Sequence, residues 1–325
     1  MGVARSLQPS KPRNVHEPDA TPHIGWPDNA PPVRLLTMSL RFHEIAESRH
    51  RILNPLTDDK LDLLGVICRI PAGARQLDLA CGKGEMLSRW AADYGLRGVG
   101  VDISKVFLND ARSRAENLGV ADRVDFIEAD AGTYKDTSEP YDIVSCIGAT
   151  WIGGGLQGTL SLLRPQLRPE GIALVGECYW ASPPPPEASA ALGMSEEVTS
   201  LAGTAESIEA AGFELLEMVM ANQDSWDRYV ASQWWTISDW LRDNPADPDA
   251  SAMRGFLAQS RRAHLEYGRR YLGWGVFVVR PVTSGRRTLF EPVDARKRRQ
   301  NRRQKAKKPP TVLVGGFFVS KIVRR

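Results

Sequence analysis

Between residues 76 and 178 the chain alternates short apolar runs with longer amphipathic ones, and this alternation constrains the fold more than any other feature. The short runs have the length and composition of buried strands, whereas the others are long enough for helices. Strands that alternate with helices predict an α/β fold in which helices cover both faces of a parallel sheet. The expected strands are Gln76–Ala80, Gly98–Val101, Val124–Ala129, Tyr141–Ile147 and Ile172–Cys178, and the expected helices are Glu85–Tyr94, Lys105–Leu118 and Leu156–Leu167.

Further patterns extend this region on both sides. Upstream, residues 40–70 have a helical pattern in which Thr57 is a candidate N-cap, because Asp58 and Asp59 follow it in the expected first turn. Downstream, two more strands are expected among helices. The downstream prediction is a helix at Leu201–Ala211, a strand at Phe213–Met220, a helical tryptophan-dense segment at Ser225–Leu241, a helix at Ala250–Tyr267 and a strand at Tyr271–Val279.

The net charge of +3 conceals two regions of opposite sign. Residues 286–325 hold 14 Lys or Arg and two acids, so they carry +12 and leave −9 for residues 1–285. An acidic body with a short basic tail differs from a nucleic-acid binder, whose positive charge lies on a folded face. We therefore predict a flexible Pro-rich leader at 1–35, a main domain at 36–281 with an insertion at about 181–270, and a basic, disordered tail at 282–325.

Membrane and cysteine signals are both weak. The apolar runs are far shorter than the ~18 residues that a membrane span needs, and residues 1–25 contain no apolar signal core. The sequence therefore predicts a cytoplasmic protein. Because the four cysteines are widely spaced and form no CxxC pair, we expect buried thiols rather than disulfides or a metal site.

The residues most informative about chemistry are Leu77–Glu85, where an expected strand enters a glycine-containing turn that opens a helix. Such a turn presents backbone N–H groups at a helix N-terminus to an anionic group. Gly82 and Gly84 have no side chain to keep a ligand away from the backbone. The next two expected strands end in Asp102 and Asp130, and an acid after the second strand commonly accepts hydrogen bonds from ribose hydroxyls. These groups predict one ligand site at the carboxyl ends of adjacent strands.

Two other nucleotide-binding turns are disfavoured. A dinucleotide fingerprint requires glycine three positions after Gly84, where this chain has Leu87. A P-loop requires Gly-Lys followed by Ser or Thr, whereas Lys83 is followed by glycine. Neither a dinucleotide nor a P-loop phosphate is therefore favoured as the ligand of this turn.

Five motifs in order resemble those of the class I S-adenosylmethionine-dependent methyltransferases. They are LDLACGKGE, GVGVDIS, VDFIEADA, YDIVSCIGA and LLRPQLRPEGIALVGE, and the resemblance extends over about residues 40–280. It implies S-adenosyl-L-methionine as the cofactor and an α/β fold with a Rossmann-like, doubly wound seven-stranded sheet. We expect an N-terminal helical cover before the first strand and an aromatic helical insertion in the tryptophan-dense region.

The resemblance also implies which residues bind the cofactor. Asp78 would orient the glycine turn and the methionine ammonium, Asp102 would bind both ribose hydroxyls, and Asp130 would accept a hydrogen bond from the adenine amino group. Ala80 departs from the glycine that many family members have at its position. The implied cofactor-binding residues are Asp78, Ala80, Cys81, Gly82, Gly84, Asp102, Ile103, Asp130, Ala131, Cys146, Ile147 and Gly148.

The residues after the fourth expected strand bear on the methyl acceptor. They run from Ile147 to Trp151 without the Asn/Asp-Pro-Pro-aromatic tetrad of methyltransferases that act on bases or glutamine side chains. The downstream tryptophans, including Trp235, either pack their helix onto the domain or line an apolar pocket, and such a pocket suits a small molecule. We therefore predict methyl transfer to a small organic acceptor.

A catalytic base is needed only if the acceptor loses a proton, and candidates are few. Glu177, at the end of the fifth expected strand, and His43, in the N-terminal helical region, are our catalytic candidates, with His50 as an alternative. Each of them could instead have a structural role. Two other functions stay open: methylation of nucleic acid aided by weak, nonspecific contacts of the basic tail, and S-adenosylmethionine binding without catalysis.

Overall fold

The computed structural model describes residues 40–137, 139–194 and 198–282. All of these belong to one compact unit that begins at Leu40. The predicted leader and, beyond Val282, the predicted basic tail lie outside the described residues. In the part of the chain that the structure describes, none of the helices is long and apolar enough to cross a membrane.

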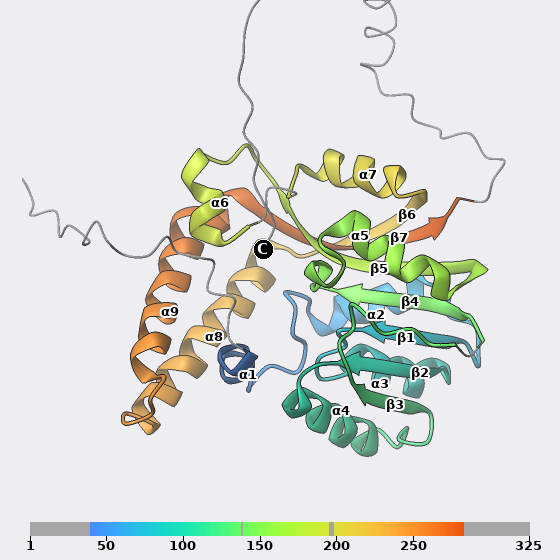
Figure 1. The fold of residues 1–325 in the computed structure, drawn as a ribbon, viewed down its shortest axis with the longest axis horizontal. Coiled ribbons are helices and arrows are strands. Elements are labelled where there is room, and N and C mark those ends of the chain that lie inside the picture. Colours follow the sequence, from blue (N-terminus) through green and yellow to red (C-terminus); the bar gives the residue numbers. More distant parts are fainter. Residues whose placement is uncertain (1–39, 138, 195–197, 283–325) are drawn as a thin grey trace, which may run out of the picture. The chain divides into compact units, whose positions relative to one another are not determined.

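A mixed, seven-stranded sheet forms the core of the described region (Figure 1). Its strands are β1 (Arg75–Leu79), β2 (Arg97–Asp102), β3 (Val124–Glu128), β4 (Tyr141–Ile147), β5 (Leu167–Trp180), β6 (Phe213–Met220) and β7 (Leu272–Pro281). They lie in the order β3-β2-β1-β4-β5-β7-β6. The first five strands in this order are parallel to one another, and β7 is antiparallel to both of its neighbours, β5 and β6. The strand order reverses between β1 and β4, which is the switch point at which doubly wound sheets bind ligands.

Helices cover both faces of this sheet. One face is packed by α2 (Asp58–Ile67), α3 (Glu85–Tyr94) and α4 (Lys105–Asn117), and the other by α5 (Leu156–Leu163) and α7 (Leu201–Ala210). The buried side chains of these helices include Leu64, Leu87, Trp90 and Ala115 on the first face and Leu160, Leu163 and Ile208 on the second. The predicted Rossmann-like α/β architecture is therefore confirmed.

A second group of helices lies beyond the sheet. The helices α1 (Leu40–Ala46), α8 (Gln223–Asp243) and α9 (Ala250–Ala263) pack together around a separate apolar core. In Figure 1 this group lies on the side toward which the arrowhead of β4 points, so it faces the carboxyl ends of the parallel strands. The remaining short helical elements are α6 (Pro186–Leu192), α10 (Arg269–Tyr271), the 3₁₀ turns Thr150–Gly153 and Arg164–Gln166, and the π-helical turn His264–Gly268.

Two local differences from the sequence prediction have physical reasons. Residues 47–57 interrupt the helical pattern predicted for 40–70, because Pro55 disfavours a helical conformation at Asn54 and contacts with other segments, such as the hydrogen bond from Lys83 to Ser48, hold the rest of the stretch. Thr57 is the N-cap of α2 as predicted, although its side chain makes no capping hydrogen bond. The sequence also predicts no helix at α6 because of its proline run, but Pro186 occupies the first turn of this helix, where proline is tolerated.

Candidate functional site

The glycine turn after β1 has an unusual backbone. Ala80, Gly82 and Gly84 have positive φ values of 57°, 54° and 62°, and Gly84 is the N-cap of α3. A Cβ on Gly82 would lie 2.7 Å from Leu53 Cδ1, and a Cβ on Gly84 would lie 2.5 Å from Phe126 Cε1. Gly82 therefore makes room for a segment over the turn, whereas Gly84 makes room for β3. Ala80 adopts the left-handed conformation at a cost of about 1–2 kcal/mol, which glycine would avoid.

Asp102, at the end of β2, fastens this turn. Its Oδ2 accepts a hydrogen bond of 2.8 Å from the Gly82 N–H, and its Oδ1 accepts one of 2.8 Å from the Ser104 N–H. Ser104 in turn caps α4 by accepting from the Phe107 N–H. The carboxylate is therefore held rigidly beside the turn, and each oxygen keeps a second lone pair for a ligand hydroxyl.

Asp78, within β1, is a buried carboxyl group with few partners. Its side chain is 4% exposed, and the Ser145 Oγ–H donates to its Oδ1 at 2.6 Å, the one hydrogen bond it makes among the described residues. Burial, with a smaller contribution from the charge of Asp102, raises the pKa of Asp78 to about 7. A buried carboxylate short of donors fits a cationic ligand group such as the methionine ammonium of S-adenosylmethionine.

The ends of β2 and β3 carry the residues expected beside the adenosine. Asp130 is exposed just after β3, and its Oδ1 accepts a hydrogen bond of 2.9 Å from the Gly132 N–H. Ala131 beside it is buried, whereas Ile103, next to Asp102, is 60% exposed. An exposed apolar side chain between two strand ends that carry acids is the arrangement expected if a purine ring lies against it.

The end of β4 forms the other side of the site. Cys146 is buried, and burial raises the pKa of its thiol, which keeps it uncharged. Gly148 has a φ of 81°, and a Cβ there would clash with Asn54 Oδ1. Ile147 lies between these two positions and is partly buried.

The cysteines are less buried than the sequence predicts. All four are free, but only Cys146 is buried, whereas Cys68, Cys81 and Cys178 are partly exposed.

The segment 40–56, which we call the cover segment, lies against these strand ends. Its Leu53 and Asn54 contact the positions of Gly82 and Gly148, as described above. Lys83 Nζ donates to the backbone oxygen of Ser48 at 2.9 Å, and the Ser104 hydroxyl donates to Glu44 at 2.7 Å. A further ion pair joins Arg51 to Glu85 at the start of α3. The cover segment is thus bound to the glycine turn and to both helices that follow it.

The two catalytic candidates lie in different surroundings. Glu177, on β5, accepts a hydrogen bond of 2.5 Å from the Thr150 hydroxyl and one of 2.8 Å from the Cys178 N–H. His43, on α1, packs the edge of its ring against Phe107 of α4, with 5.2 Å between ring centroids. No hydrogen bond joins the two candidates within the described residues.

A third group near the site, centred on Glu47, was not predicted from the sequence. Glu47 of the cover segment is 1% exposed, and its Oε1 accepts hydrogen bonds of 2.6 Å from Tyr229 Oη and 2.6 Å from Gln233 Nε2. His50 Nδ1 lies 2.8 Å from its Oε2. The sequence signal was the spacing of Tyr229 and Gln233, four residues apart on one helical face, but nothing in the sequence pairs them with Glu47.

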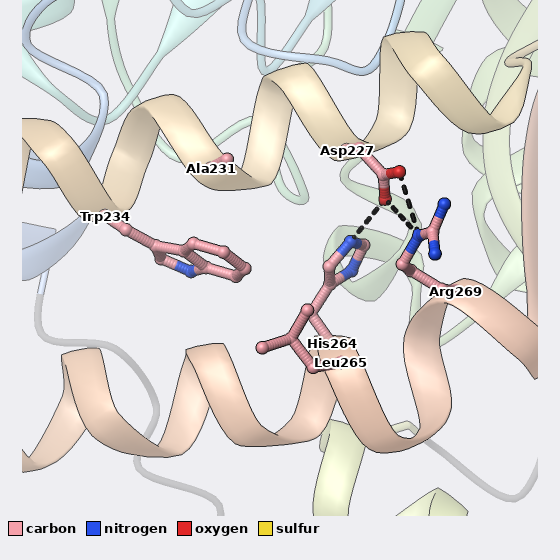
Figure 2. A pocket seen from close by; sticks show the side chains of 6 residues that line it. All are labelled: Asp227, Ala231, Trp234, His264, Leu265 and Arg269. Atoms are coloured by element: carbon pink, nitrogen blue, oxygen red, sulfur yellow. Dashed lines mark hydrogen bonds and ion pairs between the residues drawn. The ribbon is translucent and has the colours of Figure 1, made fainter.

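The tryptophan-dense segment forms α8, which packs against α1 and α9. Trp234 lines a hollow of about 260 Å³. Figure 2 shows its side chain between α8 and the helical turn that follows α9. Trp234 Nε1 donates to Ser260 Oγ at 3.0 Å, so it packs the two helices together, whereas Trp235 is 71% exposed.

An ion-pair network borders the same hollow. Asp227 accepts from His264 Nε2 at 2.8 Å and from Arg269 Nε at 2.9 Å, which ties α8 to the π-helical turn (Figure 2). None of the six side chains that line this hollow is among the residues implied for cofactor binding.

Three comparisons identify similar proteins. A family model described as "Methyltransferase domain" matches residues 77–171. The uncharacterized protein YjhP of Escherichia coli (strain K12) is 43% identical over 242 residues, which cover 74% of this chain and 97% of that protein. A crystal structure of a SAM-dependent methyltransferase from Geobacter sulfurreducens in complex with S-adenosyl-L-homocysteine has 45% sequence identity and a TM-score of 0.71, covering 74% of this chain and 98% of that one.

A more distant relative is the ubiquinone/menaquinone biosynthesis C-methyltransferase UbiE of Ectopseudomonas mendocina (strain ymp). It is 28% identical over 167 residues, which cover 48% of this chain and 65% of that protein. The motifs, the strand order and these similarities agree with one another. The chain therefore belongs to the class I S-adenosylmethionine-dependent methyltransferases.

Proposed function

We propose that this enzyme transfers the methyl group of S-adenosylmethionine to a small organic acceptor. The observation that supports a small acceptor is the cover segment, whose Leu53 and Asn54 lie directly on the glycine turn and on Gly148. A long polymer would need an open groove at these strand ends, whereas a covered site suits a molecule that can be enclosed.

The proposed binding residues match the parts of the cofactor in charge and polarity. Asp102 has lone pairs for ribose hydroxyls, Asp78 offers a buried carboxylate to the ammonium, and Asp130 offers an exposed carboxylate to the adenine amino group. The remaining positions implied by the resemblance, from Ala80 to Gly148, supply backbone and apolar surface. When bound, the cofactor supplies an electrophilic methyl group on a sulfonium.

The work of the chain is then positioning and exclusion of water. Methyl transfer is an in-line displacement that gains most from fixed geometry. Glu177 is the carboxylate at the carboxyl end of β5, and we propose that it contacts the acceptor, with Thr150 holding one of its oxygens. His43 packs against Phe107, which favours a role in placing α1 over a role in proton transfer.

Relatives add support for the acceptor class. UbiE is named as a C-methyltransferase of ubiquinone and menaquinone biosynthesis, so its methyl transfer belongs to the synthesis of small molecules. The alternative of a nucleic-acid acceptor depends on the basic tail, which lies outside the described residues. Cytoplasmic location also stays a prediction.

The test is to supply methyl-labelled S-adenosylmethionine with either a small-molecule cell extract or purified RNA and DNA. We expect label in a small molecule and none in nucleic acid. The matched control is Asp102→Ala, which should abolish the labelling. Label in nucleic acid alone would refute the proposed acceptor class, and tight cofactor binding without labelled product in either pool would favour a non-catalytic binder.

A further inference from the structure

The buried cluster around Glu47 joins segments that are far apart in the sequence. Tyr229 and Gln233 of α8 both donate to Glu47 Oε1 at 2.6 Å, and His50 Nδ1 lies 2.8 Å from Oε2. His50 Nε2 is in turn hydrogen-bonded to the Ser232 hydroxyl. One carboxylate therefore meets three polar side chains in an interior where it is 1% exposed.

This cluster lies against the part of the cover segment that contacts the glycine turn and Gly148. Tyr229 Oη is 3.2 Å from the backbone oxygen of Leu53, whose side chain lies on Gly82. The next residue, Asn54, lies on Gly148 at the end of β4. Tyr229 therefore contacts, through Leu53, the stretch of the cover segment that lies on the glycine turn and on the end of β4, the neighbour of β5 in the sheet.

A buried carboxylate would cost folding free energy without benefit if the cluster served only to attach the cover segment to α8. Burying a carboxylate costs several kcal/mol, and apolar side chains of similar volume commonly do as well or better. The neighbouring cations have other partners, since Arg49 pairs with Asp239 and Lys83 with Asp110. His50 is therefore the one basic side chain that contacts Glu47 in the described part of the chain.

We propose that Tyr229, Glu47 and His50 form a proton relay that accepts the proton released by the methyl acceptor. This inference rests on the proposed function, and it deepens it: the acceptor carries a hydrogen on the atom that is methylated, as a hydroxyl, an amine or an acidic C–H group does. Acceptors without such a hydrogen, such as thioethers, have no use for the relay.

The proton moves in a balanced sequence. The acceptor atom gives its proton to a lone pair of Tyr229 Oη as it gains the methyl group, while the Tyr229 O–H proton passes to Glu47 Oε1 over the 2.6 Å hydrogen bond. The electron pair of the broken carbon–sulfur bond stays on sulfur, which becomes a thioether. Rotation of the protonated Glu47 carboxyl group then turns its proton toward His50, whose Nδ1 lies 2.8 Å from Oε2 and has no hydrogen-bond partner among the described residues. His50 accepts this proton at Nδ1 and releases the proton of its Nε2 to solvent, because its side chain is 14% exposed.

Burial and the charge of Glu47 raise the pKa of Tyr229 well above its ordinary value. The phenol therefore stays protonated and passes a proton on without holding a negative charge itself. This behaviour distinguishes a relay from a phenolate base.

The test compares Tyr229→Phe and Glu47→Gln with wild type, using methyl-labelled S-adenosylmethionine and a small-molecule cell extract. Tyr94→Phe is the matched control, because it removes a phenol hydroxyl that packs against Gly65, far from the cluster. At neutral pH both cluster variants should lower transfer by about 10²-fold, the usual scale for a lost general base, while the control keeps wild-type transfer. S-adenosylhomocysteine affinity, measured by calorimetry, should stay within about threefold of wild type in all three variants.

The pH profile separates a relay from a merely structural role. In both cluster variants the loss should shrink as pH rises, because hydroxide replaces the relay, whereas a structural defect lowers transfer by the same factor at every pH. Ultraviolet titration of phenolate is a readout independent of activity: the Tyr229 signal, absent in Tyr229→Phe, should move to lower pH in Glu47→Gln.

Each outcome is decisive. Wild-type transfer in Tyr229→Phe, a loss that is constant with pH, or a Tyr229 titration that Glu47→Gln does not move would overturn the relay and leave the proposed function standing. If wild type itself labels no small molecule, the proposed function fails and the relay fails with it. Loss of S-adenosylhomocysteine binding in both cluster variants would assign the cluster to attachment of the cover segment and also overturn the relay.

Discussion

The two sides of the site differ in how they are built. The cofactor side consists of strand ends in residues 78–148, whose positions follow from one alternating pattern along the chain. The proposed acceptor side joins the cover segment to α8, so that Glu47 contacts residues more than 180 positions later. Local patterns therefore determine the cofactor side, whereas the packing of distant segments determines the acceptor side. Substitutions on the cofactor side should abolish cofactor binding, and substitutions on the proposed acceptor side should change the rate of methyl transfer.

The largest effect is expected from Asp102→Ala. This change removes the acceptor of the Gly82 and Ser104 N–H groups together with the proposed ribose contacts. S-adenosylhomocysteine binding should weaken at least ~100-fold, and each unpaired N–H should cost about 1–3 kcal/mol of unfolding free energy. Calorimetry and urea unfolding measure the two losses. Asp125→Ala is the control, because Asp125 is an exposed acid on β3. An unchanged dissociation constant for S-adenosylhomocysteine in Asp102→Ala would show that Asp102 does not belong to the site.

Among variants that remove no proposed ligand contact, Glu85→Gln should lower the unfolding free energy most. Glu85 is 4% exposed and pairs with Arg51 of the cover segment and with Arg114 of α4. Removing one member of a buried ion-pair network costs about 3–5 kcal/mol. Arg51→Ala, by contrast, removes a side chain that is 44% exposed, so its loss should be below about 1 kcal/mol.

The same pair of variants tests how independent the two sides are. Hydrogen exchange of residues 47–56 should be faster in Arg51→Ala, because that variant loosens the cover segment alone. If residues 47–56 exchanged no faster in Arg51→Ala than in wild type, the cover segment would not open independently of the rest, and this comparison would be contradicted.

Asp78 makes cofactor affinity depend on pH. Its ordinary pKa is 3.8, and burial raises it to about 7, so without ligand the carboxylate is protonated below that pH. A ligand ammonium requires the charged form, so the dissociation constant for S-adenosylhomocysteine should rise about tenfold for each pH unit below 7. Asp78→Asn should bind weakly, with a dissociation constant that changes little over this range. A wild-type affinity that is constant from about pH 5 to 8 would contradict an ammonium contact.

The same shift affects the ligand-free protein in the opposite direction. Between about pH 4 and 7 the folded state keeps a proton on Asp78 that the unfolded state has released. The unfolding free energy should therefore fall as pH rises through this window, and it should fall less in Asp78→Asn. Urea unfolding at a series of pH values measures the difference.

Much of the cofactor side could be predicted from the sequence, for a physical reason. Strand β4 begins and ends at the predicted residues, because continuous apolar runs identify strands that are buried on both faces. Carboxyl ends of parallel strands share one edge, so Asp102 and the glycine turn had to be neighbours, and their hydrogen bond of 2.8 Å follows from the topology.

The acceptor side could not be predicted in the same way. The break at residues 47–57 depends on contacts with other segments, such as the hydrogen bond from Lys83 to Ser48, and not on periodicity alone. The cluster of Glu47 and Tyr229 requires knowledge of which helix face meets the cover segment. Nor does composition show that Gly84 makes room for Phe126. These are tertiary contacts, and a single sequence holds no local signal for them.

The smallest effect is expected from Trp235→Ala, which tests whether the aromatic residues of α8 line the acceptor pocket. Trp235 is 71% exposed, so its removal should change the unfolding free energy by less than about 0.5 kcal/mol. Cofactor affinity and methyl transfer should stay at wild-type values.

The adjacent Trp234 provides the matched comparison. Its indole donates to Ser260 and packs edge-on against His264, with 5.8 Å between ring centroids, so Trp234→Ala should cost about 3 kcal/mol by leaving a void between α8 and α9. Because this face of α8 is not the face that carries Tyr229, transfer per folded molecule should still change less than about threefold. Suppose instead that Trp235→Ala lowered transfer by more than about tenfold and left affinity for S-adenosylhomocysteine unchanged. The acceptor would then bind to the exposed face of α8, and the contrast between a local cofactor side and an enclosed acceptor side would fail.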